Sequence, residues 1–505
     1  MRRKLPGRKL PDNLVRVNPH VPPDWIGVLS RQLLRLIGAA GGILFAASVP
    51  LRAAEPAAPA DAPLTRGLAH ALEAAPLRGA RVGALVVDDA DGRVVFDREA
   101  DQPLVPASNL KILTALAALR VFGPAHAFTT RVYADAVPDA EGGVGTLYIR
   151  GGGDPGLTSE DYWRLAADLH RAGLRRVRGD LVIDDSLFDG ERWHPSWQPT
   201  TARAYVAPIG ALMANYSAYA VVVTGGDAQG GPVAVAVDPP IGFFRVDNQA
   251  RTGAGKRLAV DHRAIDGGEE VVVTGAFPRR AERTFQRSVL DPSGYAASVL
   301  RLQLGAVGIT VGGAVRRAYV PETAHELLAF EGRPLSDVVR RFLKFSNNPI
   351  GEALVKSLSA SAEGAPGNWK SGVAVVRREL DALGLPTAGL VQVDGSGLSY
   401  DDRATPRLLA AAVREGSHSF RFGAEFVASL PIGSTDGTLE RRAHRAGPEL
   451  RAKTGLLTRV TALSGLARRP DGHTLAFSVI VNGFRGDAHS AIAALDAFAA
   501  ALVQP

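Results

Sequence analysis

The stretch PLVPASNLKILTALAAL occupies Pro103–Leu119 and contains a serine and a lysine three positions apart, Ser108 and Lys111. Its apolar residues recur at helical spacing, so both polar residues fall on the first turn of a predicted helix. The chain has eight lysines against 50 arginines, which makes lysine an unusual choice for an exposed cation here. Residues i and i+3 share one helix face with Cβ atoms ~5–6 Å apart, so the amine reaches the hydroxyl.

A lysine beside a serine has a clear chemical use. A serine hydroxyl is a poor nucleophile until a neighbouring base removes its proton. Burial or a second cation nearby lowers the pKa of a lysine, and the neutral amine is then such a base. The start of a helix also offers free backbone N–H groups, so the N–H of Ser108 is a natural half of an oxyanion hole. The pair alone also arises by chance, so its interpretation depends on the rest of the chain.

Two further short motifs accompany the pair. FSNNP contains Ser346 and Asn348, and RAKTG contains Lys453, Thr454 and Gly455 on a predicted strand. The patterns Ser-x-x-Lys, Ser-x-Asn and Lys-Thr-Gly each occur once in the chain. Their order is the one that penicillin-interacting serine enzymes use. The three motifs together therefore predict an active site.

On these motifs the chain resembles the class C low-molecular-mass penicillin-binding proteins, the D-alanyl-D-alanine carboxypeptidase/endopeptidase family. The resemblance runs from about residue 64 to the C-terminus. Ser108 and Ser346 are 238 residues apart, and this family carries extra domains in that interval, which is much shorter in β-lactamases and simpler carboxypeptidases. Further similar stretches are GGGDP at 151–155, GDLVIDDSLFDG at 179–190, DGSGLSYDDRATP at 394–406 and LPIGSTDGTLERR at 430–442.

The resemblance implies three catalytic residues. Ser108 would attack the carbonyl of the penultimate D-Ala, form an acyl-enzyme and release the terminal D-Ala. Lys111 would be the base in this acylation. Ser346 would relay the proton to the leaving amine, together with Lys453. Water would then hydrolyse the ester.

The resemblance also implies five substrate-binding residues. Asn348 would hold the acyl-side amide of the substrate and orient Lys111, while Lys453 and Thr454 would face its terminal carboxylate. Gly455 would let the substrate approach the strand closely. Leu456 would supply the second oxyanion N–H.

Two positions depart from the family pattern. The middle residue of Ser-x-Asn is Asn347, where the family often has Asp. Leu456 follows Lys-Thr-Gly, where the family usually has Ser or Thr. The backbone N–H survives at Leu456, but a hydroxyl near the substrate carboxylate is lost, so we expect weaker binding of that carboxylate. Asp394 and the glycines after it are expected to shape a wall near the cleft.

Periodicity divides the chain into segments. Residues 64–127 and 325–505 show mixed helical and strand patterns, whereas short Val- and Gly-rich runs dominate residues 128–324. The expected fold is therefore α+β. The resemblance makes it a transpeptidase-like domain, an antiparallel sheet flanked by helices, interrupted by one or two inserted β-rich domains with an inner insertion at roughly 151–221.

The basic charge belongs to the N-terminal leader. Residues 1–54 hold nine Lys or Arg and two Asp, which equals the whole formal charge of +7, so the rest gives no support for nucleic-acid binding. Arg31 and Arg35 precede an apolar run at 36–49 that is typical of a signal sequence. We expect an exported protein of the periplasm or cell envelope, with membrane contact only through an uncleaved leader or at the periphery.

The expected partners follow from the resemblance. They are peptidoglycan peptides ending in D-Ala-D-Ala, with β-lactam antibiotics as inhibitors. The chain has no cysteine and its 11 histidines lack metal-ligand spacing, so no metal or other cofactor is expected. Two alternatives stay open, a β-lactamase and a non-catalytic peptidoglycan-binding protein. Against them stand the large insertion, the lack of a stretch resembling the deacylating-Glu loop of class A β-lactamases, and the intact motifs.

Overall fold

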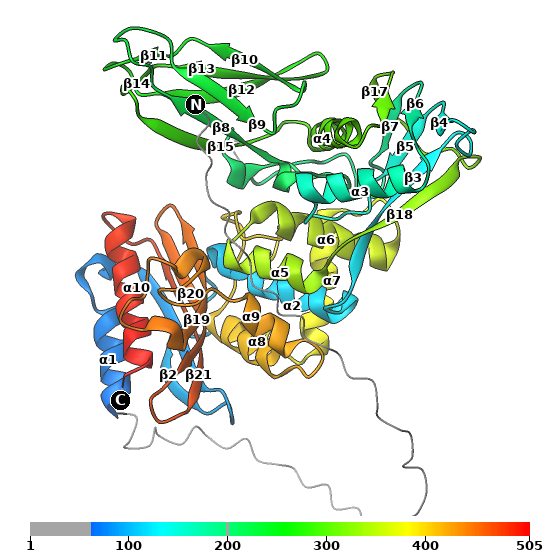
Figure 1. Cartoon of the computed structure of the whole chain (residues 1–505). Helices are drawn as coiled ribbons and strands as arrows, with labels where there is room; N and C mark the ends of the chain where they lie inside the picture. The colour runs from blue at the N-terminus through cyan, green and yellow to red at the C-terminus, as the bar shows by residue number, and fades with distance from the viewer. Residues whose placement is uncertain (1–61, 198–200, 505) are drawn as a thin grey trace, which may run out of the picture. The chain divides into compact units, whose positions relative to one another are not determined.

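The computed structural model describes residues 62–197 and 201–504. The predicted signal sequence at 1–54 lies outside this range. A five-stranded antiparallel sheet, in the order β19–β20–β21–β1–β2, joins the two ends of the described chain (Figure 1). Its strands are β1 (Arg81–Asp88), β2 (Val94–Arg98), β19 (Leu450–Leu457), β20 (Val460–Arg468) and β21 (Thr474–Asn482).

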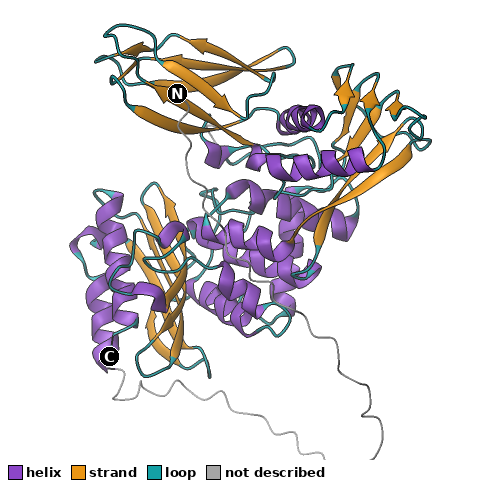
Figure 2. Cartoon of the chain, viewed as in Figure 1, coloured by secondary structure: helices purple, strands orange, loops and turns teal. Residues whose placement is uncertain are grey.

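Helices cover both faces of this sheet (Figure 2). Alternate residues of a strand point to opposite faces, and both faces of β1 are apolar. Ala84 and Val86 pack in the cluster that includes α1 (Ala62–Leu72) and α10 (Ala488–Leu502). Leu85 packs in the opposite cluster, with helices α2 (Lys111–Phe122) and α8 (Pro406–His418). The predicted antiparallel sheet flanked by helices is thereby confirmed.

The second cluster is a group of helices around α2 (Lys111–Phe122). Every residue of α2 from Lys111 to Leu119 is buried, because the helix is apolar on all sides and packs within the group. Its neighbours are α5 (Leu335–Lys344), α6 (Asn348–Glu363), α7 (Trp369–Ala382), α8 (Pro406–His418) and α9 (Gly423–Ser429). A polar side chain at the start of α2 is therefore withdrawn from water.

The insertion leaves the helical group after α2 and returns before α5. Its main sheet has the order β17–β7–β5–β3–β18, and the antiparallel pair β3–β18 carries the chain out and back. The strands are β3 (Ala127–Ala134), β5 (Leu147–Arg150), β7 (Leu181–Asp184), β17 (Val315–Arg317) and β18 (His325–Pro334). A smaller sheet contains β4 (Gly143–Val144), β6 (Arg176–Val177) and β16 (Thr310–Val311). Because β18 belongs to the main sheet of the insertion, the inserted segment extends to Pro334, beyond the expected boundary at residue 324.

The insertion is not only β-rich. Helix α3 (Ser159–Arg171) begins at a capping box formed by Thr158 and Asp161, and α4 (Pro292–Ala306) begins at the N-cap Asp291. Both helices contribute buried residues to the insertion's own core. The sequence pattern did not predict these two helices, because Val- and Gly-rich runs typical of strands lie on both sides of each.

A second unit is nested inside the insertion, at residues 218–288. It contains two three-stranded sheets and one strand pair and no α-helix. The strands are β8 (Ala218–Thr224), β9 (Ala234–Asp238), β10 (Phe244–Asn248), β11 (Arg251–Thr252), β12 (Ala259–Ile265), β13 (Gly268–Thr274), β14 (Ala276–Phe277) and β15 (Glu282–Ser288). The expected inner insertion at 151–221 does not coincide with this unit, because its strand β7 pairs with β5 and β17 of the outer sheet.

Candidate active site

Ser108 and Lys111 lie where the short turn η3 (Ala107–Leu110) meets helix α2. Lys111 Nζ is 3.0 Å from Ser108 Oγ, 2.6 Å from Asn348 Oδ1 and 2.7 Å from the carbonyl oxygen of Ser396. The Lys111 side chain is fully buried. Three separate segments of the chain thus meet at one buried amine.

Ser346 and Asn348 are placed by the start of helix α6. The Asn347 side chain accepts a bond from the backbone N–H of Ile350 at 3.3 Å, and Pro349 occupies the first turn. The helix therefore begins two residues after Ser346, whose φ of 57° is left-handed. Asn348 then turns its Oδ1 to Lys111 and donates from Nδ2 to the carbonyl oxygen of Tyr205 at 2.8 Å.

Lys453 is the second buried amine of the site. It lies on β19 and donates to Ser346 Oγ at 2.8 Å and to the carbonyl oxygen of Thr454 at 2.6 Å. Burial lowers the pKa of Lys453 well below its usual value, and the positive charges of Lys111 and Arg442 lower it further. Ser346 therefore contacts an amine that resists protonation.

Strand β19 is the outer strand of its sheet. The backbone of residues 431–433 covers its outer edge at Leu450 and Ala452. No other described strand pairs with that edge from Lys453 onward. The Thr454 hydroxyl donates to Thr438 at 2.7 Å. The uncovered edge thus begins at the predicted Lys-Thr-Gly motif.

Gly455 and Leu456 continue this edge. A Cβ at Gly455 would lie 3.0 Å from the carbonyl oxygen of Pro106 and 3.2 Å from Ala107 Cβ. The glycine therefore lets β19 approach the two residues that precede Ser108. Leu456 is 50% exposed and lines the cleft.

A cavity of about 410 Å³ unites the predicted residues Ser108, Ser346, Asn348 and Leu456. Lys111 and Lys453 lie behind two of them, in contact with their hydroxyl groups. The three motifs did not indicate the remaining lining residues, which come from the insertion, from residues 398–400 and from the end of β19. They are Ser196, Trp197, Thr201, Tyr205, Val206, Leu398, Tyr400, Leu457 and Thr458. The insertion residues carry no motif of their own, so no local signal could have identified them.

The electrostatic setting of Lys111 favours a neutral amine near neutral pH. Burial lowers the pKa of Lys111 to about 7, while the carboxylates of Asp394, Glu352 and Asp402 act in the opposite direction. Burial raises the pKa of Glu352 to about 8 and that of Asp402 well above its usual value, each with help from Asp394. Asp394 is therefore the carboxylate whose charge matters most to Lys111.

Asp394 organises the turn that holds Lys111. Its carboxylate accepts bonds from the backbone N–H groups of Ser396, Gly397 and Ser399 at 3.0, 2.6 and 2.9 Å. A fourth bond comes from Trp197 Nε1 of the insertion at 2.9 Å. The carbonyl oxygen of Ser396 in this turn is the one that accepts from Lys111. Asp394 thus links the insertion to the buried amine.

Two further observations concern the described part of the chain. Within residues 62–197 and 201–504, no three or more His, Asp or Glu side chains are grouped so that they could hold a metal ion. None of the helices in these ranges is long and apolar enough to span a membrane.

The Trp197–Asp394 bond gives a testable prediction. Trp197→Phe keeps an aromatic side chain but removes the indole N–H, so a buried carboxylate oxygen has one donor fewer, which costs ~1–3 kcal/mol, and the smaller ring also loses packing at this buried position. We expect the thermal and urea midpoints of unfolding to fall accordingly. Trp163→Phe is the matched control, because Trp163 is 50% exposed on α3 and should leave both midpoints unchanged. Equal midpoints for the two variants would contradict the stabilising role of this bond.

Comparison with known proteins identifies the family of the chain. The model of the D-Ala-D-Ala carboxypeptidase 3 (S13) family matches residues 64–502. The chain is 38% identical to a D-alanyl-D-alanine carboxypeptidase of Actinomadura sp. (strain R39), over 83% of this chain and 81% of that protein. It is 26% identical to D-alanyl-D-alanine carboxypeptidase DacB of Haemophilus influenzae, over 82% and 88% of the two chains.

The fold is also found among solved structures. The crystal structure of penicillin-binding protein 4 (dacB) from Haemophilus influenzae matches with a TM-score of 0.73 and 23% identity, and the match covers 86% of this chain and 97% of that one. The chain therefore belongs to the D-Ala-D-Ala carboxypeptidase 3 (S13) family of serine peptidases.

Proposed function

We propose that this carboxypeptidase hydrolyses the bond between the last two D-alanines of peptidoglycan stem peptides through an acyl-enzyme on Ser108. The observation that carries the proposal is the contact of Ser108 Oγ with the buried amine of Lys111 at 3.0 Å, at the wall of an open cavity. In this proposal the catalytic domain consists of residues 64–126 and 335–505.

Acylation begins with proton transfer from Ser108 to Lys111. Because the pKa of Lys111 is about 7, a large part of the amine is neutral at neutral pH and accepts the proton. Ser108 Oγ then attacks the carbonyl carbon of the penultimate D-Ala. The backbone N–H groups of Ser108 and Leu456 stabilise the oxyanion. The tetrahedral intermediate then collapses: the C–N bond breaks, while Ser346, in contact with Lys453, gives a proton to the nitrogen of the leaving D-Ala and recovers one from the protonated amine. The net result is transfer of the Ser108 proton to the released D-Ala, and water then hydrolyses the ester.

The substrate peptide adds to the uncovered edge of β19. Asn348 uses one N–H for Tyr205, so its second N–H is available to the acyl-side amide of the peptide. Lys453 donates to Ser346 and to the carbonyl oxygen of Thr454, which places its amine at the position proposed for the terminal carboxylate. Thr454 lies beside it.

β-Lactams enter the same reaction, because their amide and carboxylate mimic the D-Ala-D-Ala end. The ring-opened leaving group stays attached and deacylation is slow. A D-Ala–diaminopimelate crosslink presents the same D-Ala carbonyl with a larger leaving group, so endopeptidase activity belongs to this proposal. Peptidoglycan lies outside the cytoplasmic membrane, which requires export, and the basic and apolar leader at 1–54 supports a periplasmic or envelope location.

The assignment of Ser108 and Lys111 is tested by substitution. Ser108→Ala should abolish covalent labelling by fluorescent penicillin and D-Ala release from a pentapeptide, with the thermal midpoint retained. Lys111→Arg should lower acylation by ~10³-fold or more, because guanidinium stays protonated in this pH range.

Mass spectrometry of crosslinked and uncrosslinked muropeptides after incubation with the enzyme measures carboxypeptidase and endopeptidase activity in the same samples. Labelling that persists in folded Ser108→Ala protein would refute the assignment of the nucleophile. An active Lys111→Arg enzyme would identify another group as the base.

The acid limb of the pH profile tests the protonation state of Lys111. The base must be neutral, so the rate of benzylpenicillin acylation should rise as the pH passes through about 7. Asp394→Asn removes a negative charge that favours the protonated amine, so the pKa of Lys111 should fall and the limb should move to lower pH. Trp197→Phe retains the charge and should leave the limb in place. A limb that stays fixed or moves upward in Asp394→Asn would contradict this account.

Leu456 tests the recognition of the carboxylate. Leu456→Thr supplies a hydroxyl beside the proposed carboxylate position, and a charge-assisted bond of ~1.5–3 kcal/mol corresponds to a tenfold or larger change in binding. We expect a lower KM for a D-Ala-D-Ala peptide with little change in kcat, and faster acylation by penicillins. An unchanged KM and acylation rate would show that Thr454 and Lys453 hold the carboxylate alone.

A further inference from the structure

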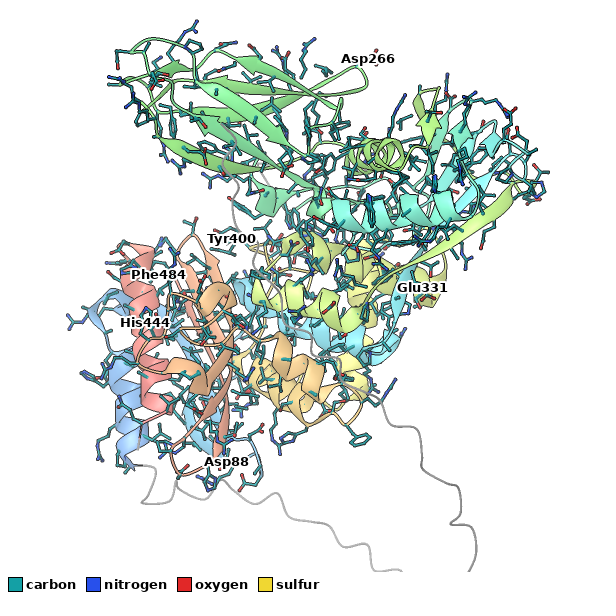
Figure 3. The ribbon with its side chains drawn as sticks, viewed as in Figure 1. Asp88, Asp266, Glu331, Tyr400, His444 and Phe484 are labelled. Atoms are coloured by element: carbon teal, nitrogen blue, oxygen red, sulfur yellow. The ribbon has the colours of Figure 1, made fainter. Side chains whose placement is uncertain are left out.

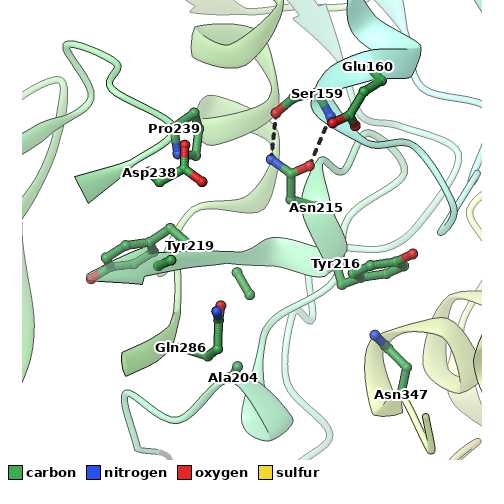
Figure 4. Close-up of a pocket in the computed structure, with 12 residues that line it drawn as sticks. Ser159, Glu160, Ala204, Asn215, Tyr216, Tyr219, Asp238, Pro239, Gln286 and Asn347 are labelled. Atoms are coloured by element: carbon green, nitrogen blue, oxygen red, sulfur yellow. Dashed lines mark hydrogen bonds between the residues drawn. The ribbon is translucent and has the colours of Figure 1, made fainter. Parts of the chain in front are cut away.

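A second cavity, of about 460 Å³, adjoins the active site on the side of the insertion. Its lining comes from the start of α3, the turn before β8, strands β8, β9 and β15, the short turn η4 (Ala204–Val206) and the start of α6. Figure 4 shows its residues: Ser159, Glu160, Ala204, Asn215, Tyr216, Tyr219, Asp238, Pro239, Gln286 and Asn347. Ala218 and Ala220 complete the lining. The nested unit, the outer insertion and the catalytic part all contribute to it.

Three polar side chains from three different elements point into this cavity (Figure 4). They are the carboxylate of Asp238 at the end of β9, the amide of Gln286 on β15, and the amide nitrogen of Asn347. Within the described residues, neither the Asp238 carboxylate, nor the Gln286 amide, nor the Asn347 nitrogen has a hydrogen-bond partner. Their donors and acceptors are thus available to a ligand.

The rest of the lining narrows the class of ligand. Tyr216 is half-buried and adds aromatic surface, whereas the Tyr219 ring is buried against Phe244. Glu160 adds a second carboxylate. No lysine or arginine is among the lining residues, so the cavity does not suit an anion. Hydroxyl and acetamido groups pair with carboxylates and amides, and the C–H faces of a sugar ring pack on aromatic rings. The chemistry therefore fits a neutral saccharide.

The wall formed by residues 215–217 is fixed in an unusual conformation. Asn215, Tyr216 and Ser217 have φ values of 49°, 59° and 54°, three successive left-handed residues without a glycine. Such a backbone costs free energy and persists only where the surroundings hold it. Here Asn215 bonds to the backbone N–H and hydroxyl of Ser159 and to Tyr295, and Tyr216 accepts a bond from Arg341 at 2.7 Å. The cavity wall is therefore preorganised.

The second cavity lies beside the catalytic cavity, and a peptidoglycan substrate carries a sugar at the far end of its stem peptide. Asn347 lies between Ser346 and Asn348 of the catalytic cavity, and Ala204 directly precedes Tyr205 of that cavity. About four stem-peptide residues separate the scissile carbonyl from the sugar that carries the peptide. At ~3.3–3.6 Å per residue they span at most ~14 Å. The sugar of a bound peptide therefore lies within ~14 Å of the scissile carbonyl, and the second cavity is lined by residues that adjoin Asn348 and Tyr205 in the chain.

We propose that this second cavity binds an N-acetylated sugar of the glycan strand to which the stem peptide is attached. The inference rests on the proposed function, which supplies the peptide. In this arrangement the insertion recognises the glycan, while the catalytic domain cleaves the peptide. The enzyme then prefers peptides that are still joined to their sugar.

The test compares two substrates, a pentapeptide and the same pentapeptide linked to its N-acetylglucosaminyl–N-acetylmuramyl disaccharide. Wild-type enzyme should have a kcat/KM about tenfold or more higher for the disaccharide form. Asp238→Ala and Gln286→Ala should each lower that preference about threefold to tenfold, the ratio expected for loss of one hydrogen bond. For the free pentapeptide and for benzylpenicillin acylation, both variants should equal wild type, which also shows that they are folded.

Asp266→Ala is the matched control, because Asp266 is an exposed carboxylate of the same nested unit, in the turn between β12 and β13 (Figure 3). It should retain the full preference. Equal kcat/KM for the two substrates in wild type would overturn the proposal, as would an undiminished preference in the Asp238→Ala, Gln286→Ala double variant. Failure of the proposed function is a separate result, because then neither substrate would release D-Ala.

Discussion

The site depends on the buried amine of Lys111, which contacts oxygen atoms from three segments of the chain. Lys111 Nζ contacts Ser108, Asn348 and Ser396, which belong to the turn η3 before α2, the start of α6 and a turn after α7. An uncompensated buried charge is costly, so the amine gives up its proton more readily than an exposed lysine does. The helices packed around α2 create this burial, and the same packing that stabilises the fold therefore sets the pKa of Lys111 near 7.

The insertion is tied to this amine at two points. The carbonyl oxygen of Tyr205 accepts from Asn348, and Trp197 donates to Asp394. Asn348 and the turn of Asp394 are the same groups that hold Lys111 in place. The insertion also lines both cavities. The insertion lies between Ser108 and Ser346 in the chain, and its contacts thus reach the residues that hold Lys111.

The sequence allowed prediction of those parts of the structure that short motifs or periodicity encode. Three singleton motifs in order predicted a meeting of Ser108, Asn348 and Lys453, and the structure places them at shared hydrogen bonds around two amines. Alternating apolar strands and helical runs predicted the sheet and its covering helices. These patterns act over a few residues, which is why they can be read without knowledge of the fold.

Other features depend on contacts that no local pattern records. The nested unit at 218–288 is defined by which strands pair, and β7 pairs with β5 and β17 across gaps in the sequence. Trp197 reaches Asp394 across 197 residues. The helix α3 had a local signal, the Thr158 and Asp161 capping box, but strand-like neighbours on both sides obscured it.

The two amines constrain each other in the proposed reaction. Burial lowers the pKa of both amines, and the positive charge of Lys111 lowers the pKa of Lys453 further. When Lys111 takes the proton of Ser108, Lys453 is driven toward its neutral form. Ser346 contacts Lys453 and lines the same cavity as Ser108, so in the proposed reaction it passes a proton onward to the leaving nitrogen. The buried pair therefore disfavours any state in which both amines retain a proton, and it directs the proton of the nucleophile toward the leaving group.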